Sequence, residues 1–309
     1  DLNKGFMNNP ISLKLSGKTD DVRFIHEILI NTESNYDKIY IQKETLNYYK
    51  GSEKTKVNRD STNTKPQVTS NVEKPYQPVN VLSNESLISN RYAEIDKFIN
   101  SWQFLLLNPD KMGYPVPQKK TFGQIKLEKD GSNVAEFLLD IRKINPNSFD
   151  GIIDALKYVL PYANDLQPSI TSELERAVYL QLTEENYKIP GWLLSTGTLR
   201  ILALLAVLRH PNPPPLIVIE EIENGLDPRT IYLILEEIRM ATESGIQVII
   251  TTHSPYLLDL IPLEFIIFVE RVNGETTFTR PSDDESMKKW SDNFATGRLY
   301  TMGQFNKGT

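Results

Sequence analysis

The segment from residue 213 to residue 253 constrains the fold of this chain more than any other. Leu216–Ile219 is a short apolar run after a proline-rich turn, a pattern typical of a strand buried on both faces of a parallel sheet. Apolar residues then recur at helical spacing over Ile231–Ile238, Gly245 ends the helical pattern, and a second apolar run follows at Ile246–Thr251. Strand, helix and strand in this order predict a right-handed βαβ unit and therefore an α/β fold.

Charged side chains follow both predicted strands. Glu220 and Glu221 come directly after the first strand, and His253 follows the second. Open α/β sheets bind ligands beyond the carboxyl ends of their strands, so these side chains are expected at one rim. A magnesium–nucleotide site needs one acidic group for the metal and a second group to deprotonate the attacking water. Two adjacent carboxylates can divide those roles. Asp227 and Pro228 fit an N-cap and the first position of the intervening helix.

Three segments resemble the ABC-type ATPases, in the branch that includes RecF-like, SMC-like and stand-alone bacterial AAA-family proteins of the anti-phage and DNA-repair kind. They are GWLLSTGTLRIL, PPLIVIEEIENGLDP and VIITTHSP, in that order. By this resemblance LIVIEE is the Walker B strand, NGLD the D-loop, TTHSP the switch-histidine loop and LSTGTLRIL a variant of the signature motif S-x-G-T-L-R. Each segment alone also fits a solvated turn, a loop histidine or a helix cap; their order and spacing favour the ATPase.

The resemblance implies a role for each candidate site residue. Glu220 takes the metal-side position, which is usually Asp, and would hold Mg²⁺. Glu221 takes the position of the catalytic base, and His253 would contact the γ-phosphate of ATP. The expected cofactors are therefore ATP and Mg²⁺.

The same resemblance implies a site shared between two subunits. Ser195, Gly197 and Thr198 would present a hydroxyl and the amides of a helix N-terminus to the γ-phosphate of an ATP held by a second copy. Asp227 would lie at the seam of this homodimer.

The phosphate-gripping loop is the one part of the site that the sequence lacks. A Walker A loop reads G-x-x-x-x-G-K-[ST], because its amides wrap the phosphates and its Lys reaches the β- and γ-oxygens. The only GKT is Gly17-Lys18-Thr19, and Ser12 stands where the first Gly is needed. The flanking residues alternate as strands, so we interpret Ser16–Asp21 as a hairpin turn. Since the chain also begins with Asp1, we expect either a segment without its N-terminal part or a natural subunit without this loop.

Composition limits the remaining possibilities. The chain has no cysteine, which excludes disulfides and thiolate metal sites and fits the reducing cytoplasm where we expect the protein to lie. No apolar run approaches the roughly 20 residues of a membrane-spanning helix. With a net charge of −6, the chain lacks the overall charge of an autonomous nucleic-acid binder, so contact with DNA would need a local basic patch.

The pattern along the chain predicts a P-loop NTPase head of the ABC type with two additions. Residues 1–50 are expected to form an antiparallel β subdomain, 51–87 a polar loop or disordered insertion, and 88–190 a helical lobe. Residues 191–309 would be the C-terminal half of the ATPase, with the signature, Walker B, D-loop and switch histidine.

Individual elements follow from periodicity within these regions. Asn133 is expected to cap the helix that follows it, and Ile95 and Trp102 to lie on the buried face of a helix. The predicted strands are Ile11–Leu15, Val22–Ile30, Lys38–Gln42, two edge strands within 165–190, and a hairpin of Glu264–Glu270 with Thr276–Arg280. The predicted helices are Arg91–Leu107, Val134–Lys143, Phe149–Leu160, Thr198–Leu208 and Trp290–Leu299.

Three functions are compatible with these features. The first is an ATP-driven dimer that acts in DNA repair or phage defence and switches a nuclease or another effector. The second is an interaction subunit that lacks the phosphate loop and partners another ATPase or a nuclease. The third is a metal-dependent nuclease built on Glu220, Glu221, Glu223 and His253, which would leave the signature loop without a purpose.

Overall fold

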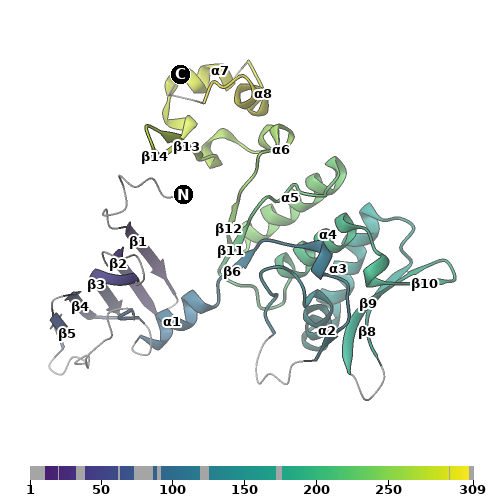
Figure 1. Ribbon diagram of the computed structural model, residues 1–309, viewed down its shortest axis with the longest axis horizontal. Coiled ribbons are helices and arrows are strands. Elements are labelled where there is room, and N and C mark those ends of the chain that lie inside the picture. The colour runs from purple at the N-terminus through teal and green to yellow at the C-terminus, as the bar shows by residue number, and fades with distance from the viewer. Residues whose placement is uncertain are drawn as a thin grey trace. The chain divides into compact units, whose positions relative to one another are not determined.

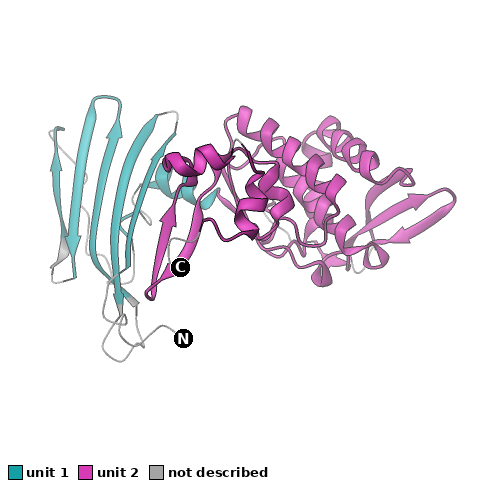
Figure 2. Cartoon of the chain, turned by 90° about the horizontal axis from the view of Figure 1, so that it is seen from above, with its two compact units in different colours: residues 1–101 teal, residues 102–309 magenta. Residues whose placement is uncertain are grey.

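The computed structural model describes residues 11–19, 21–32, 39–61, 63–72, 86–88, 92–118, 125–171, 176–291 and 293–305 of the 309-residue chain. Two compact units divide the chain, Asp1–Ser101 and Trp102–Thr309, shown in different colours in Figure 2. The boundary separates the antiparallel sheet from the parallel sheet, so each unit has its own core.

Unit 1 is a five-stranded antiparallel meander in which each strand pairs with the next in sequence. Its strands are β1 (Ile11–Lys18), β2 (Val22–Thr32), β3 (Ile39–Lys50), β4 (Glu53–Asp60) and β5 (Asn63–Ser70). Apolar and polar residues alternate along them, so one face is buried, as expected for an antiparallel sheet. The helix α1 (Ala93–Asn100) packs on that face, where Ile95 is fully buried and the Phe98 ring meets Phe24 edge-on.

A buried carboxylate lies on the inner face of this sheet. Glu44 is fully buried and accepts hydrogen bonds from His26 Nε2 at 2.7 Å, Arg59 Nε at 3.1 Å and the Leu87 amide at 2.8 Å. Burial by itself raises the pKa of this carboxyl, but the hydrogen bonds from His26 and Ser86 outweigh burial and hold the pKa below its ordinary value. Glu44 thereby connects three strands to the segment around residue 87.

Two predictions for the N-terminal region need correction. The polar loop predicted at 51–87 is wrong for Glu53–Asp60 and Asn63–Ser70, which form β4 and β5; residues 73–85 lie outside the described part. Alternating residues such as Thr55, Val57 and Arg59 face the core, a period-2 signal that the polar composition hides. The hairpin turn predicted over Ser16–Asp21 is too long, because Gly17 and Lys18 still belong to β1, opposite Phe24 and Arg23; the GKT thus continues a strand, as its flanking alternation indicates.

Unit 2 is a mixed α/β structure with several sheets. Its helices are α2 (Val134–Ile144), α3 (Pro146–Val159), α4 (Thr196–Leu208), α5 (Pro228–Glu243), α6 (Pro255–Asp259), α7 (Glu285–Ser291) and α8 (Thr296–Thr301). Its strands are β6 (Gln103–Leu105), β7 (Val116–Pro117), β8 (Asp165–Ile170), β9 (Ala177–Glu184), β10 (Tyr187–Pro190), β11 (Leu216–Ile219), β12 (Gln247–Ile250), β13 (Phe268–Val272) and β14 (Glu275–Thr279).

Unit 2 contains a three-stranded parallel sheet in the order β12-β11-β6, with α5 beside it (Figure 1). β11, α5 and β12 form the predicted βαβ unit, with Ile217 opposite Val248 and Ile219 opposite Ile250. The helix α4 packs against α5 and is buried from Thr198 to Leu208 because it has no polar face. The core of unit 2 therefore lies on one side of the parallel sheet, under α4 and α5.

The described residues leave the other face of the parallel sheet partly exposed, contrary to the prediction of a strand buried on both faces. Phe104, Val218 and Ile249 stand side by side on this face, since Val218 pairs with Phe104 in β6 and with Ile249 in β12. Phe104 is 48% exposed and Ile249 45%, and Leu106, two residues beyond Phe104, is 42% exposed. An apolar run cannot distinguish one covered face from two, because what covers a face is a tertiary matter.

Several boundaries in the predicted helical lobe change. The helix expected over Arg91–Leu107 ends at Asn100, and Gln103–Leu105 joins the parallel sheet as β6. Asn133 does not cap α2 with its side chain. It accepts from the Glu128 amide at 2.8 Å and donates to the Lys126 carbonyl at 2.8 Å, and so holds the preceding loop.

The remaining elements are close to the prediction. The sequence predicts two edge strands within 165–190. The structure has β8, β9 and β10 in this range, and β9 pairs antiparallel with β8, β10 and the earlier strand β7. The predicted terminal hairpin forms from β13 and β14, whereas the single helix predicted at Trp290–Leu299 is the two short helices α7 and α8. Among the described residues, no helix combines the length and apolar character needed to cross a membrane.

Candidate functional site

The candidate site lies at the carboxyl ends of β6, β11 and β12. The parallel ladder continues past β11, since the Glu220 amide donates to Leu105 O at 2.9 Å and the Thr251 amide donates to Ile219 O at 3.0 Å. The residues that follow these three strands therefore begin at the same hydrogen-bonded edge of the sheet. This edge places Glu220 and Glu221 beside the Thr251–His253 loop, as the sequence predicts.

Glu221 has an unusual backbone conformation that its neighbours hold in place. Its φ is +49°, in the left-handed region that residues other than Gly rarely adopt and that costs about 1–3 kcal/mol. The Glu221 amide donates to Thr251 Oγ1 at 2.9 Å, and the Glu221 carbonyl accepts from the Arg200 guanidinium at 2.9 Å. Asn224 Nδ2 donates to one carboxylate oxygen, Oε2. The Glu221 side chain is exposed at the rim while its backbone is fixed.

Arg200 connects the signature segment to this turn. It is the only charged residue in α4, is 5% exposed, and donates to Leu107 O and Glu221 O, both at 2.9 Å. Its Nε is buried without a hydrogen-bond partner among the described atoms. Burial lowers the pKa of the guanidinium, while the carboxylates of Glu221 and Glu223 oppose this shift. One buried cation thus ties α4, the end of β6 and the Glu221 turn together.

The other acidic residues of the turn have separate partners. Glu220 points to Lys129, with Oε1 3.5 Å from Nζ, and both side chains are about half exposed. Glu223 Oε1 accepts from the His253 amide at 2.7 Å, which fixes the switch-histidine loop to the turn after β11. Glu223 Oε2 is buried without a partner among the described atoms. The His253 ring is left exposed at the same rim.

Asp227 caps the helix α5. Its carboxylate accepts from the amides of Arg229 at 2.9 Å and Thr230 at 3.3 Å and from Thr230 Oγ1 at 2.6 Å. The Thr230 hydroxyl, together with these amides, holds the pKa of Asp227 below its ordinary value. Asp227 and Pro228 therefore begin the helix as predicted, and Asp227 is exposed.

The signature segment forms the N-terminus of α4. Ser195 is the N-cap, and its Oγ accepts from the Thr198 amide at 3.1 Å and lies 2.8 Å from Thr198 Oγ1. Thr198 is buried, and its hydroxyl lies against the Ser195 cap. The amides of a helix's first turn have no acceptor within the helix. Ser195 Oγ satisfies the Thr198 amide, so the amides of Thr196 and Gly197 remain without an acceptor in the helix.

The predicted signature loop packs directly on the predicted D-loop of the same chain. A Cβ placed on Gly197 would lie 2.6 Å from the Gly225 carbonyl oxygen, closer than real Cβ contacts. Gly225 in turn has a φ of +70°, and a Cβ there would be 3.6 Å from Arg200 Cδ and from Thr196 Oγ1. The close approach requires glycine at 197, and the positive φ favours glycine at 225, so two segments about 30 residues apart in the chain meet at one surface.

All the candidate residues except Thr198 are accessible at or near this rim. The sequence interpretation missed the positioning role of four residues, Arg200, Thr251, Glu223 and Asn224, and named Glu223 only as a candidate residue of the nuclease. Arg200 carried a detectable signal, since a lone charge inside an apolar helix needs a buried partner. The other three residues form hydrogen bonds between loops, and such contacts leave no periodic pattern in the sequence.

The rim offers carboxylates suited to a metal that is shared with phosphate. Among the described residues, no three His, Asp or Glu side chains converge on one point. Mg²⁺ in nucleotide sites keeps several waters and takes oxygen ligands from phosphate, so one or two carboxylates suffice. Glu220, whose side chain is about half exposed beside the Glu221 turn, fits that donor set.

The sequence of the chain matches one known family. A model described as "AAA domain, putative AbiEii toxin, Type IV TA system" matches residues 1–259. The chain belongs to this family. All the candidate site residues of this AAA-domain protein lie within the match, whereas β13, β14, α7 and α8 lie outside it. A search of curated proteins gives no match.

Solved structures similar to this AAA-domain protein include heads of SMC ATPases. One is an SMC head bound to the C-winged-helix domain of ScpA, with 11% identity, covering 86% of this chain and 76% of that one, at a TM-score of 0.42. Another is the SMC head domain from Thermotoga maritima, with 13% identity over 84% and 74% of the two chains, at 0.37. A third comes from work on ATP-driven dimerization and DNA-stimulated activation of SMC ATPases, with 15% identity over 49% and 96%, at 0.36. With these TM-scores, the family assignment rests on the sequence match.

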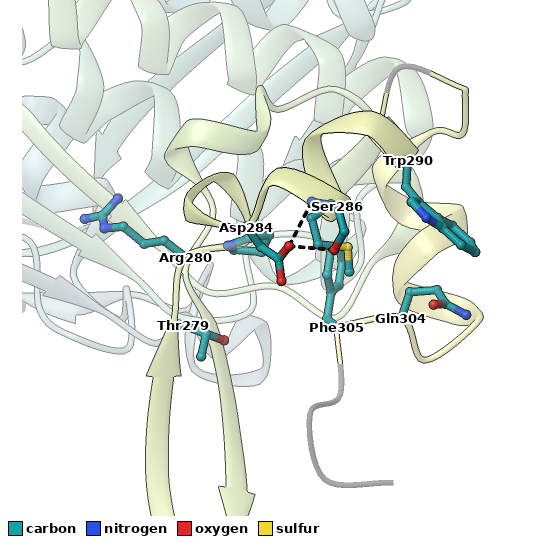
Figure 3. Close-up of a pocket in the computed structure, with 9 residues that line it drawn as sticks. Thr279, Arg280, Asp284, Ser286, Trp290, Gln304 and Phe305 are labelled. Atoms are coloured by element: carbon teal, nitrogen blue, oxygen red, sulfur yellow. Dashed lines mark hydrogen bonds between the residues drawn. The ribbon is translucent and has the colours of Figure 1, made fainter.

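A separate cavity of about 270 Å³ lies in the C-terminal part of the AAA-domain protein (Figure 3). It is lined by residues from the end of β14, from α7 and from the chain end, among them Thr279, Asp284, Trp290 and Phe305. Asp284 is already occupied by the amide and hydroxyl of Ser286, drawn as dashed lines in the figure. None of the candidate ATPase residues lines this cavity.

Replacement of Arg200 tests whether it holds the Glu221 turn. In Arg200→Met, the carbonyls of Leu107 and Glu221 lose charge-assisted hydrogen bonds, and we expect a loss of about 2 kcal/mol in the free energy of unfolding. Chemical denaturation measures this loss, and amide hydrogen exchange at residues 221–226 should rise by more than in α5. Arg239→Met, on an exposed arginine, is the control. Equal stability of the two variants would contradict the role of Arg200.

Proposed function

We propose that this chain carries the catalytic half of an ATP-hydrolysing site and uses it in a dimer. The observation that carries the proposal is the convergence of three motifs on one rim: Glu220 and Glu221 after β11, the His253 loop after β12, and the signature loop packed on the D-loop at Gly197 and Gly225. Membership of an AAA-domain family supports ATPase activity.

Within the proposed site, Glu221 is the general base. Thr251 holds its backbone amide and Arg200 its backbone carbonyl. The backbone from which the exposed carboxylate extends is therefore fixed at the rim. Oε2 is occupied by Asn224, which leaves Oε1 to accept the proton of the water that attacks the γ-phosphate. A backbone held in advance lowers the cost of orienting the base during the reaction.

Glu220 and His253 take the supporting roles. Glu220 would hold a magnesium ion, which would neutralise negative charge on the phosphates of the nucleotide. Lys129 pairs with Glu220, and this half-exposed pair is weak enough to exchange for a metal. The Glu223 carboxylate holds the amide of His253, so the ring extends over the rim, where it contacts the γ-phosphate.

The N-terminus of α4 acts on the ATP of a second copy. Ser195 is exposed, and the amides of Thr196 and Gly197 are those that the Ser195 cap leaves without an acceptor in the helix. A helix N-terminus with such amides favours an anion. Since Asp227 lies exposed beside the same packed turn, the homodimer seam crosses the signature loop and the D-loop together.

The phosphate grip comes from a segment that covers the open face of the parallel sheet. Parallel sheets are stable when both faces are covered, yet Phe104, Leu106 and Ile249 expose apolar surface on one face. β12 is an edge strand of this sheet, and its carboxyl end leads to His253. A strand and helix added there would bring a phosphate-binding loop to the same rim as the acids.

The isolated 309-residue chain is accordingly expected to bind Mg-ATP weakly or not at all. Most of the affinity for ATP comes from the amides and the Lys of a phosphate loop, a motif that the sequence does not contain. Isothermal titration calorimetry measures the affinity directly. Micromolar binding by this chain alone would show that another segment grips the phosphates.

The open face gives a second test of this arrangement. A charge at Ile249 adds little strain where the side chain is already 45% exposed, so Ile249→Asp should change the stability of the isolated chain by less than about 1 kcal/mol. In the form of the protein that binds ATP, the same change should abolish nucleotide binding. Ile267→Asp, at an equally exposed residue outside the family match, is the control. If both variants bind ATP normally, the face has no covering segment.

The dimer is expected to switch a partner in DNA repair or phage defence. This context follows from the likeness of the signature, Walker B and switch-histidine segments to the ATPases of that branch. ATP closes the dimer and hydrolysis opens it, and the effector would be a nuclease or another protein that senses the closed state.

A further inference from the structure

Basic side chains gather on the outer face of the five-stranded sheet in unit 1. The inner face is defined by Phe24, Leu46 and Val57, and residues alternate between the faces along each strand. The basic residues at outer positions are Lys14 and Lys18 in β1, Arg23 in β2, Lys43 in β3, and Lys54 and Lys56 in β4.

Part of this set forms one row across four strands. Lys18 is opposite Arg23, Arg23 is opposite Tyr49, and Tyr49 is opposite Lys54. The Arg23 guanidinium lies 6.0 Å from the centre of the Tyr49 ring. Lys56 stands two residues beyond Lys54 on the same face. With strands about 4.8 Å apart, this row of cations extends over roughly 14 Å of flat, solvated sheet.

Few carboxylates on this face balance these charges. Lys14 pairs with Glu27 at 2.7 Å, and Lys43 stands opposite Asp60. The other four, Lys18, Arg23, Lys54 and Lys56, form no ion pair with any residue that the structure describes. Like charges directly opposite one another, such as Lys18 and Arg23, destabilise a sheet. Neither the stability of unit 1 nor the chain's net charge of −6 accounts for this concentration of positive charge.

We propose that this face binds the sugar–phosphate backbone of double-stranded DNA without sequence preference. Backbone contacts come from Lys and Arg together with Asn, Thr, Gln and Tyr side chains, and the remaining outer positions supply Thr45, Asn47, Tyr49, Asn58 and Gln67. The Tyr49 ring in this row is covered by Arg23 and is therefore not free to stack on an unpaired base.

An anionic membrane is a poorer match for the same charges. Surfaces that insert into lipid carry exposed Trp, Phe or Leu beside the basic residues. The apolar residues on the outer face here are Ile25 and Leu29, and both are half-buried between neighbouring strands. The proposal for this face is independent of the ATP site, which lies in unit 2.

The test compares two triple variants of the 309-residue chain that change its net charge equally. The first, Lys18→Gln, Arg23→Gln and Lys54→Gln, removes the row; the second, Lys143→Gln, Lys188→Gln and Lys289→Gln, removes exposed lysines of unit 2. Fluorescence anisotropy with a labelled 30-base-pair duplex at several salt concentrations measures affinity and its salt dependence. All the replaced side chains are exposed, and circular dichroism verifies that each variant is folded.

We expect the row variant to bind the duplex at least tenfold more weakly at low salt, and the control variant to bind like the wild type. The slope of log affinity against log salt should fall by about 2–3, since each phosphate contact contributes roughly 0.9. Arg23→Lys alone should retain binding, and scrambling the duplex sequence should change nothing. Equal weakening by both variants, no binding of the duplex by the wild type, or binding of anionic vesicles in its place would overturn the proposal.

Discussion

Glu221→Gln is expected to lower ATP turnover by a factor on the order of 10² to 10⁴ in the form of the protein that binds ATP. Gln has the size of Glu and can keep a hydrogen bond with Asn224, but its amide cannot accept the proton of the attacking water. The backbone bonds to Thr251 and Arg200 do not involve the side chain, so the turn should keep its conformation. Steady-state phosphate release measures the loss.

A measurement of nucleotide affinity distinguishes a variant that lacks only the general base from one whose nucleotide site is lost. Nucleotide affinity should survive Glu221→Gln, and the ATP-bound dimer should persist longer because hydrolysis no longer opens it. Glu236→Gln, at an exposed acid on α5, is a control that should hydrolyse ATP normally. Near-normal hydrolysis by Glu221→Gln would place the base elsewhere.

Ser195→Arg is expected to abolish ATP-driven dimerisation and hydrolysis while the subunit still folds and binds nucleotide. The Arg side chain would fill the exposed N-terminus of α4 where the γ-phosphate of the second copy must approach. Loss of the Ser195 cap itself costs about 1 kcal/mol. Ser195→Ala loses the same cap without added bulk and is therefore the matched control, which should retain dimerisation.

Mixing two inactive variants tests whether the site is shared. A heterodimer of Ser195→Arg and Glu221→Gln has one site with an intact base from the first subunit and an intact signature loop from the second. Its other site has neither. Each mixed dimer therefore has one working site of two, so a mixture should recover turnover in proportion to the heterodimers formed, up to about one half of the wild-type value. An inactive mixture in which heterodimers demonstrably form would exclude a site shared in this way.

The local structure around the candidate site follows from the sequence. The βαβ unit is set by the apolar runs of β11 and β12 and the helical period between them, and Asp227-Pro228 begins α5 as cap and first residue. The hairpin of β1 and β2 likewise follows from the period-2 alternation on both sides of Gly17-Lys18-Thr19, although Gly17 and Lys18 belong to β1 and not to the turn. Each of these features depends on residues close together in the chain, where propensity and periodicity act directly.

Only the tertiary structure determined the other features: the extra strands of unit 1, the exposed face of the parallel sheet and the conformation of the Glu221 turn. The polar composition of Glu53–Asp60 hid β4, since the sheet needs only alternate residues facing its core. The open face at Phe104 and Ile249 depends on what packs there, and an apolar run reads the same with one face covered or two. The left-handed turn at Glu221 depends on Arg200, 21 residues away, whose guanidinium reaches the carbonyl only when α4 packs beside β11. Contacts between distant segments leave no periodic trace in the sequence, so only the folded chain reveals them.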